Sequence, residues 1–573
     1  MILQLIVGSA LAYFGWSIIS LERNVRKARS LNVPIVRLPI DPVNFLWVFL
    51  QGHVWNVLDR LPVAWSSWPD SIRFSYRGWQ FREKSSPAVR FGPIWALVTP
   101  VTFYLQFTDP DAINELFSRR SDFIRPVKNY KLLEVYGPCI STAGWDDWPR
   151  HRKVLAAPFN ESIMSFVWGE SLRQASSMLR SWSSPTQSME GISSVQKDTR
   201  TLSLNVLAAT GFRKSYDFRG SSDMSCQDEA GGYRDALQTV LDNAILIMIL
   251  PYEYLQGFLV PKKLVRIGNA ARSFKKHMMQ MLEDETSALR DNKPGSGGLM
   301  SSFVRALDRH EREAVAQPNL KGSKDGKRGL SIDEIFGNLF VINFAGHDTT
   351  ANTLAFIMLL LAAHPEVQDW AAEELLSVEA IQNSDIGKWD YNTVFPRLKR
   401  CQAVLLETLR IYPPIMSLPK WTKERAQTLR VGEKVLVIPP GVGTSPNLLA
   451  MHTHPKYWAD PFVWRPSRWI VGGPAYGPES GVCDEDFWTP LPHTYFPFSD
   501  GPQNCPGAKF AKVEVVAVLA CLLKSHRLGV KKGPGEAEEV ARERVVNCTN
   551  DVNLEILLRM RDADCVKLVC TKA

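Results

Sequence analysis

A cysteine near the end of the chain has the sequence setting of a metal-binding thiolate. Cys505 lies between a glycine- and proline-rich turn, which begins at Gly501, and an apolar helical pattern from Ala508 to roughly Leu523. Pro506 suits the first position of a helix, so the sequence predicts that Cys505 lies at a helix N-terminus. The unpaired N–H groups and the helix dipole at that end favour a thiolate over a thiol. A thiolate held in this way is a good axial ligand for haem iron. The alternative is a buried structural cysteine at a turn.

The residues around this cysteine resemble the cysteine-ligand signature of the cytochrome P450 family of haem-thiolate monooxygenases. Phe498, Gly501, Cys505 and Gly507 stand at the positions that the signature requires. The resemblance implies that the protein binds haem b, that Cys505 is the axial iron ligand, and that the residues around it contact the cofactor. Gln503 departs from the pattern, because the family usually has Arg or His there, which donates to a haem propionate. Gln503 can still donate a hydrogen bond, but it brings no charge.

A second candidate for chemistry lies in the middle of a long helical pattern. Ser331 and Glu334 form a capping box, and the helix that they predict runs without proline to His364. Gly346 in the interior of such a helix costs about 1 kcal/mol relative to Ala, so its presence needs a reason. The Thr349 hydroxyl can bond to the carbonyl four residues earlier and open the helix locally. These features predict a groove where a small ligand can approach the backbone. The alternative is a core helix with a small-residue packing spot.

The same segment resembles the oxygen-activation motif of the cytochrome P450 family at Ala345, Gly346, Asp348 and Thr349. By that resemblance Ala345 and Gly346 border the haem, and Asp348 and Thr349 are catalytic residues that deliver protons for the activation of dioxygen. The chemistry requires such groups, because splitting the O–O bond needs protons from hydroxyl, carboxyl and water groups in an apolar pocket. We expect His347 to be a polar spacer rather than a metal ligand.

Cationic side chains elsewhere are candidates for binding the haem propionates. Trp148 and Arg152 are four residues apart, so they share one face of a predicted helix. They resemble the family's W-x-x-x-R helix, in which the two side chains hold a propionate. The alternative is an exposed stacking pair. Lys420 follows Leu418-Pro419 at the place where many members have an Arg directed toward a propionate.

A buried ion-pair triad is a further expectation that the resemblance supports. Glu407 and Arg410 have the spacing E-x-x-R, which alone predicts no more than a surface ion pair. Tyr412-Pro413-Pro414 follows directly, as the exit of the corresponding helix does in the family. Arg468 lies in a segment, Trp464–Trp469, that resembles the one from which the family takes a second arginine. We therefore assign Glu407, Arg410 and Arg468 to the triad that locks the haem-binding core.

The bulk composition argues against several other classes of protein. The chain has 573 residues, 45% of them hydrophobic, which is ample for a large core, and its length alone would suggest several domains. Its nine cysteines show no C-x-x-C pair, so neither a disulfide framework nor a zinc site is indicated. The net charge of +8 is not concentrated in one tail, and nucleic-acid binding is not indicated. Because the motifs follow the family's order, the resemblance implies one mainly α domain with small β-sheets, the cytochrome P450 fold, over residues 60–573.

The first residues have the composition of a membrane anchor. Ile2 to Leu21 carry no charge, and a helix of that length spans about 30 Å, the thickness of a bilayer core. Basic residues between Arg23 and Arg29 place the following chain on the cytoplasmic side. We predict a single-pass anchor over residues 1–21, in the endoplasmic reticulum with the catalytic domain facing the cytosol, and a juxtamembrane linker over residues 22–59. The rival interpretations are a cleaved signal peptide, which would need a basic start, and a buried first helix.

Together these features predict a membrane-anchored haem-thiolate monooxygenase that inserts one oxygen atom of O2 into a hydrophobic small molecule. The sequence contains no flavin- or nucleotide-binding pattern, so we expect the electrons to come from a partner, which the resemblance implies to be an NADPH-dependent flavoprotein reductase. Arg150, Lys153, Lys509 and Lys512 flank the motifs and predict a basic docking face for it. The sequence resembles fungal microsomal members that act in secondary metabolism. The alternatives are dehydrogenation, oxidative coupling or rearrangement by the same fold, and a non-catalytic haem-binding membrane protein.

Overall fold

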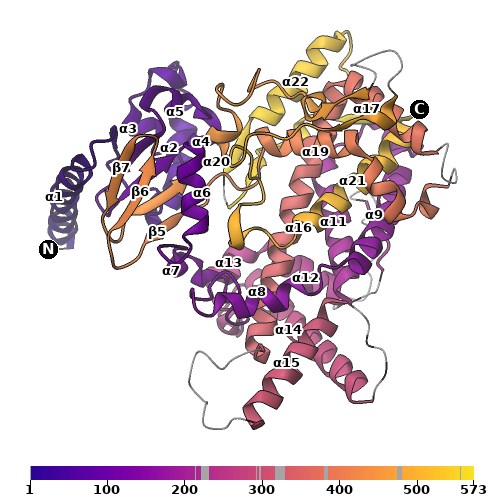
Figure 1. The fold of residues 1–573 in the computed structure, drawn as a ribbon, viewed down its shortest axis with the longest axis horizontal. Helices are drawn as coiled ribbons and strands as arrows, with labels where there is room; N and C mark the ends of the chain where they lie inside the picture. The colour runs from indigo at the N-terminus through magenta and orange to yellow at the C-terminus, as the bar shows by residue number, and fades with distance from the viewer. Residues whose placement is uncertain are drawn as a thin grey trace.

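The computed structural model describes every residue except 1, 213–214, 221–231, 292, 294, 296–297, 317–328, 380–384, 474–480 and 555. Helices make up most of it, and the strands form one larger sheet and several two-stranded sheets. Figure 1 shows the N-terminus and strands β5 (Lys420–Thr422), β6 (Gln427–Val431) and β7 (Lys434–Ile438) on one side, and the long helices on the other. The expected architecture, mainly α with small β-sheets, is confirmed.

The larger sheet joins the beginning of the chain to its second half. Its strands lie in the order β1 (Ile35–Arg37), β2 (Ile94–Val98), β3 (Phe103–Phe107), β8 (Gly443–Pro446), β5 and β4 (Phe123–Ile124). Strands β2 and β3 pair antiparallel, while β1 joins β2 and β8 joins β3 in parallel. Because β1 is part of this sheet, the segment 22–59 that we expected to be a linker contributes a strand to the body of the protein.

The remaining strands form antiparallel pairs. Strands β6 and β7 form a hairpin that turns at Gly432, whose φ is +57°, as the sequence between Thr428 and Ile438 predicts. The other pairs are β9 (Ile470–Val471) with β10 (Asp486–Phe487), β11 (His526–Val530) with β14 (Leu568–Lys572), and β12 (Val552–Leu554) with β13 (Leu558–Met560).

The helices account for the rest of the body. Those in the first half are α1 (Ile2–Arg29), α2 (Phe45–Leu58), α3 (Asp70–Arg73), α4 (Trp79–Glu83), α5 (Ser86–Phe91), α6 (Pro110–Ser118), α7 (Val127–Tyr130), α8 (Trp148–Ala156), α9 (Glu161–Trp182), α10 (Pro185–Glu190), α11 (Val195–Phe212), α12 (Tyr233–Asp242), α13 (Ala244–Ile249) and α14 (Lys262–Arg290). Those in the second half are α15 (Leu299–Ala316), α16 (Ile332–Ala363), α17 (Pro365–Glu379), α18 (Tyr391–Val394), α19 (Lys399–Ile411), α20 (Leu448–His452), α21 (Ala508–Ser525) and α22 (Glu538–Asn550).

Helix α16 is the central element of the helical body (Figure 1). It begins with the predicted capping box, in which the Ser331 hydroxyl accepts from the Glu334 N–H at 3.3 Å and the Glu334 carboxylate accepts from the Ser331 N–H at 2.8 Å. Every residue from Leu354 to Ala363 is buried, against α11, α19 and α21 among others. Beyond its exposed first turn, α16 is open around Ala345 and Thr349.

The end of α1 is fastened to the large sheet. Val25 and Ala28 are buried, and the Asn24 side-chain amide donates to the Thr99 carbonyl at 3.0 Å. Among the residues that the structure describes, no single helix is long and apolar enough to cross a membrane; α16 and α17, bent by 107°, pass that test only as a pair and only by length and composition. The N-terminal anchor stays a prediction.

A buried carboxyl in this core yields a prediction about stability. Glu514 on α21 is 1% exposed, and burial raises its pKa from 4.5 to about 8, although the Ser203 hydroxyl donates to it at 2.7 Å. The unfolded chain therefore loses this proton at lower pH than the folded protein, and stability falls as pH rises from about 4.5 to 8.

We expect Glu514→Gln, which imitates the protonated carboxyl, to exceed the native protein in stability by on the order of a few kcal/mol at pH 8. At pH 4.5 the difference should be small. Urea unfolding at the two pH values measures this change, and an equal difference at both would contradict it.

Candidate active site

The turn before Cys505 is shaped by backbone geometry. A short 3-10 helix, η11 (Gly501–Gln503), precedes it, and the Cys505 N–H donates to the Phe498 carbonyl oxygen at 2.8 Å. Gly501 has a φ of +64°, and a Cβ there would lie 3.1 Å from the Phe117 carbonyl oxygen. The turn therefore requires glycine at this position, for conformation and for space.

The helix that follows Cys505 starts later than the sequence predicts. Helix α21 begins at Ala508 with Gly507 as its N-cap, so Pro506 lies in a turn before the helix and the prediction that it opens the helix is wrong. Cys505 is exposed to solvent, but the protein around it still desolvates the thiol and raises its pKa above the ordinary value, whereas the Gly507 N–H and the charges of Arg152 and Arg125 act to lower it. A bound metal cation would add to the groups that favour the thiolate.

Three cationic side chains converge on the two residues before the cysteine. Lys420 Nζ donates to Gln503 Oε1 at 2.8 Å, and Arg125 Nη2 donates to the Gln503 carbonyl oxygen at 2.9 Å. Arg152 donates to the Asn504 carbonyl oxygen at 3.0 Å and to its side-chain oxygen at 2.7 Å. Burial and the charge of Arg125 lower the pKa of Lys420 to about 7. These hydrogen bonds all go to carbonyl and amide oxygens, so they bring no carboxylate to the three cations.

This set of donors fits haem. Two propionates would supply negative charge to the three cations, and Cys505 on the same loop would offer a thiolate to the iron. Gln503 stands where the family usually has a cation, and here its side chain accepts from Lys420. The positive charge is therefore supplied by Arg125, Arg152 and Lys420 around Gln503 rather than by residue 503 itself.

Trp148 and Arg152 lie on the same short helix, α8. Trp148 is buried and stacks on Trp145, with ring centroids 6.5 Å apart and an interplanar angle of 11°. Arg120 lies over the Trp145 ring, with its guanidinium carbon 4.4 Å from the centroid. One turn further on, Arg152 reaches Asn504, so α8 carries one of the three cations to the cysteine loop.

The middle of α16 has the opening that its sequence predicts. Thr349 Oγ1 donates to the Ala345 carbonyl oxygen at 2.8 Å, which is the bond to the carbonyl four residues earlier. Ala345 is exposed and Thr349 is half-buried. A Cβ at Gly346 would make an ordinary contact with Leu207 at 3.4 Å, so packing against α11 does not explain the glycine.

The neighbouring Asp348 lies in an ion-pair cluster. Its carboxylate pairs with Arg200 Nε at 3.1 Å and with Arg559 Nη2. His347 is buried beside it, and burial lowers the pKa of this imidazole to about 4, so it is neutral at physiological pH. Asp348 therefore precedes Thr349 on the same helix. Its side chain, however, is bound by arginines from other elements.

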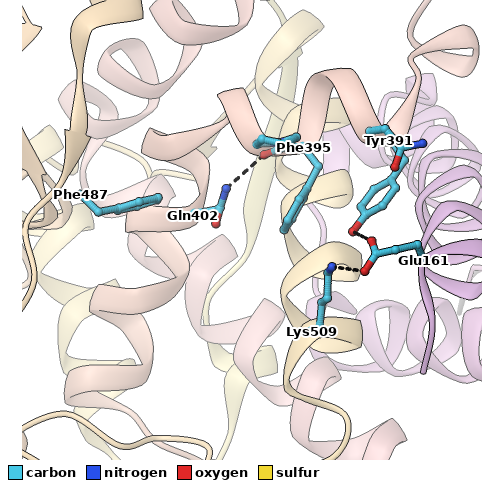
Figure 2. A pocket seen from close by; sticks show the side chains of 8 residues that line it. Glu161, Tyr391, Phe395, Gln402, Phe487 and Lys509 are labelled. Carbon is cyan, nitrogen blue, oxygen red and sulfur yellow. Dashed lines mark hydrogen bonds and ion pairs between the residues drawn. The ribbon is translucent and has the colours of Figure 1, made fainter. Parts of the chain in front are cut away.

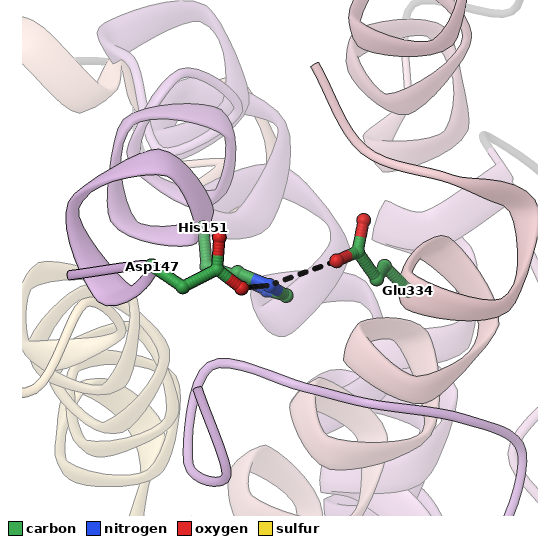
Figure 3. A group of neighbouring side chains, drawn as sticks. All are labelled: Asp147, His151 and Glu334. Atoms are coloured by element: carbon green, nitrogen blue, oxygen red, sulfur yellow. Dashed lines mark ion pairs between the residues drawn. The ribbon is translucent and has the colours of Figure 1, made fainter. Parts of the chain in front are cut away.

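A compact charged cluster ties α8 to the start of α16 (Figure 3). His151 Nε2 lies 3.5 Å from Asp147 and 3.6 Å from Glu334, and these three residue types could ligate a metal ion. Arg150, however, donates to Asp147 at 2.9 Å and to Glu334 at 2.8 Å, so the protein already supplies the positive charge. We interpret the cluster as a structural link between the two helices.

Because Arg150 is buried in this cluster, the prediction that Arg150 belongs to a basic docking face is wrong.

A shallow pocket of about 320 Å³ opens between α9, α18 and α21 (Figure 2). Lys509 Nζ pairs with Glu161 at 2.5 Å, and the Tyr391 hydroxyl donates to the other Glu161 oxygen at 3.2 Å. None of the residues expected to bind haem lines this pocket, so it is not the candidate active site.

Of the other residues of the predicted docking face, Lys509 and Lys153 are exposed at the surface, and Lys512 is partly buried.

The structure brings together the three residues assigned to the triad. Arg410 donates to the Glu407 carboxylate at 2.8 and 2.9 Å, and Arg468 donates to it at 3.0 Å. Trp469 Nε1 adds a fourth bond at 3.0 Å. Glu407 and Arg410 have no exposed side-chain surface and the Arg468 side chain is 6% exposed, so the charges of this network are almost completely buried.

Comparison with known proteins identifies the family. The model of the family described as cytochrome P450 matches residues 80–550. The chain belongs to the cytochrome P450 family. A cytochrome P450 monooxygenase of Arthrobotrys oligospora is 29% identical over 570 residues, covering 96% of this chain and 95% of that protein. A phomenoic acid biosynthesis cluster cytochrome P450 monooxygenase of Leptosphaeria maculans is 28% identical over 544 residues, covering 89% of each. The crystal structure of a cytochrome P450, CYP102L1, shares the fold, with a TM-score of 0.60 at 19% identity over 85% of this chain and 96% of that chain.

As a cytochrome P450 monooxygenase, the protein is an oxidoreductase that uses haem with a cysteine thiolate as the axial ligand. When bound, haem supplies the redox chemistry by which dioxygen is activated. The chain itself supplies a thiol at Cys505, and Arg125, Arg152 and Lys420 would hold the propionates. The Thr349 hydroxyl can pass a proton within the open turn of α16, since its oxygen both donates and accepts.

Sequence reasoning missed Arg125, Arg200 and Arg559. Arg125 bonds to a residue 378 positions away, and Arg200 and Arg559 reach Asp348 across 148 and 211 positions. A lone arginine, whether in a loop as Arg125 or in a helix or strand as Arg200 and Arg559, carries no local signal of such a partner. The one hint in the sequence was the neutral Gln503, because a cation that balances a propionate would then have to come from another part of the chain.

Proposed function

We propose that this cytochrome P450 is a membrane-anchored enzyme that inserts one oxygen atom of dioxygen into a hydrophobic small molecule. We propose that it receives electrons from an NADPH-dependent flavoprotein reductase and acts in secondary-metabolite biosynthesis. The open turn of α16, where Thr349 bonds to Ala345 beside Asp348, is the observation that carries the oxygen-insertion proposal. It retains both a hydroxyl and a carboxyl for proton supply, which chemistry without oxygen activation would not require.

Product analysis under labelled dioxygen tests this proposal. The purified holoenzyme, reconstituted with a flavoprotein reductase and NADPH, should convert a hydrophobic substrate to a product that carries one labelled oxygen atom. A product that has lost hydrogen or formed a new ring without gaining label would instead indicate dehydrogenation, oxidative coupling or rearrangement.

The role in secondary metabolism draws support from the similar proteins. The Leptosphaeria maculans relative is named for the phomenoic acid biosynthesis cluster. The identity of 28% does not extend that substrate to this chain. A spectral binding screen over terpenoid, polyketide, alkaloid and fatty-acid libraries would identify the substrate class.

Membrane anchoring draws support from exposed apolar side chains near the N-terminus. Helix α1 exposes apolar side chains along its middle, and α2 exposes a second set at helical spacing. These residues are Leu11, Tyr13, Phe14, Trp16, Ile18 and Ile19 on α1, and Leu46, Phe49, Leu50, Val54 and Val57 on α2. We propose that α1 lies in the membrane of the endoplasmic reticulum. Recovery of the full chain in the soluble fraction of expressing cells would contradict this.

The reductase proposal predicts an effect of surface charge. Lys153→Glu combined with Lys509→Glu should raise the KM for the reductase about tenfold, because a docking face for an acidic partner loses four charge units. Turnover driven by hydrogen peroxide, which needs no partner, should be unchanged. Lys434→Glu, on the separate β6–β7 hairpin, is the control. An unchanged KM in the double variant would contradict the docking face.

A further inference from the structure

Two consecutive residues of strand β13 bind two consecutive turns of α16. Arg559 pairs with the Asp348 carboxylate, and the Leu558 carbonyl oxygen accepts from the Asn352 side-chain amide at 2.6 Å. The Leu558 N–H in turn donates to the Pro414 carbonyl oxygen at 2.9 Å, just beyond the end of α19. The β12–β13 hairpin is thus fixed to the helix that contains the open turn at Ala345.

The charges around Asp348 are balanced, so each arginine matters. Arg200 bridges Asp348 at 3.1 Å and Asp242 at 3.0 Å, while Arg559 pairs with Asp348 alone among the described residues. His347 adds no charge, because burial keeps its imidazole neutral. Without Arg559, Arg200 would have to balance the charges of both Asp348 and Asp242.

The exposure of these groups falls from the surface toward the helix. The Asp242 side chain is 42% exposed and those of Arg200 and Arg559 are each 31% exposed, whereas that of Asp348 is 9% exposed. Asp348 is therefore the buried end of a charged chain that begins in solvent, and it adjoins Thr349 in the sequence. Because the two guanidinium groups keep their protons, they can only orient Asp348; a proton bound for the open turn of α16 would pass by way of the Asp348 carboxyl itself.

We propose that Arg559 is a positioning residue: through its ion pair with Asp348, the β12–β13 hairpin holds that carboxyl in the orientation needed for proton supply during oxygen activation. This rests on the proposed function. One complete turnover oxidises one NADPH and one substrate C–H bond, reduces one O2 and consumes one proton, giving the hydroxylated product, NADP+ and water. When the proton is not delivered for cleavage of the O–O bond, one NADPH, one O2 and one proton give NADP+ and hydrogen peroxide instead, and the substrate is unchanged.

Arg559→Gln should therefore raise the ratio of hydrogen peroxide to product about tenfold, the effect of one lost charge-assisted contact on the competing steps. The KM for substrate should change less than twofold, and Arg559→Lys, which keeps the charge, should restore much of the coupling. Arg561→Gln is the matched control, because Arg561 lies next to the same strand but pairs with exposed Asp551 at 3.0 Å. Equal peroxide release from both glutamine variants would overturn the proposal, since it would indicate general loosening of the hairpin.

A double variant tests whether Arg559 acts through Asp348. Adding Arg559→Gln to Asp348→Asn should leave the peroxide ratio of Asp348→Asn unchanged, whereas additive effects would overturn the proposal.

Hydrogen exchange supplies a readout that does not depend on turnover. Arg559→Gln should speed amide exchange in residues 552–560 and around residue 348, whereas Arg561→Gln should not. Equal protection of these amides in the native protein and in Arg559→Gln would overturn the proposal that the Arg559–Asp348 ion pair holds the hairpin on α16. If the parent enzyme incorporates no labelled oxygen, the proposed function fails, while this exchange result still decides whether the hairpin holds Asp348.

Discussion

Glu407→Gln is expected to destabilise the protein by about 3–5 kcal/mol, a large part of the 5–15 kcal/mol that typically separates folded from unfolded states. Glu407 accepts hydrogen bonds from Arg410, Arg468 and Trp469, and its side chain has no exposed surface. The amide keeps the shape but removes the charge, so two arginines remain buried without a counter-ion. Urea unfolding of the holoenzyme and the yield of haem-containing protein measure the effect.

The matched control for this change is an exposed ion pair on a helix. Glu538 pairs with Arg542 at 3.3 Å, and both side chains are more than a third exposed. Glu538→Gln should cost less than about 1 kcal/mol, because solvent screens such a pair. If Glu407→Gln were no more destabilising than Glu538→Gln, the triad would not lock the core.

Replacing both Arg125 and Arg152 with Gln should raise the rate of haem loss on the order of a hundredfold. Each charged hydrogen bond contributes about 1.5–3 kcal/mol, so two together exceed the roughly 2.8 kcal/mol that corresponds to a factor of a hundred. The effect should be large in this protein because Gln503 brings no charge of its own, and only Lys420 of the three described cations at the cysteine loop would remain. Transfer of haem to a high-affinity acceptor protein measures the rate.

Lys509→Gln is the control for the haem-retention experiment. Lys509 lies close to Cys505 in sequence, but it pairs with Glu161 in the surface pocket of Figure 2. It should retain haem as the native protein does. Equal haem loss from the double variant and from the native protein would exclude Arg125 and Arg152 as propionate ligands.

Features that depend on neighbouring residues could be predicted from the sequence. The capping box of α16 and the bond from Thr349 to Ala345 each span at most four positions, and the structure has both. In both cases the residue types fix the local geometry. The mainly α fold with small sheets was instead implied by the resemblance to the cytochrome P450 family, which the order of the motifs supports.

Features that depend on distant packing could not be predicted in this way. The tie between Arg559 and Asp348 exists only because a hairpin near the C-terminus lies on α16. Arg150 has the sequence setting of a surface cation, yet it is buried against Glu334, 184 positions away. Pro506 is compatible with a first helical position, but Gly507 caps the helix instead.

The central claim is that Cys505 is the thiolate ligand of a haem bound beside Arg125, Arg152 and Lys420. The ferrous–carbon monoxide spectrum of the purified holoenzyme tests it most directly, with Cys505→Ser as the variant and Cys483→Ser, an exposed cysteine, as the control. The native protein and the control should show the strongly red-shifted Soret band of a thiolate-ligated haem, and Cys505→Ser should lose it while keeping its helical circular dichroism. A red shift that survives in Cys505→Ser, or is absent from the native holoenzyme, would contradict the assignment.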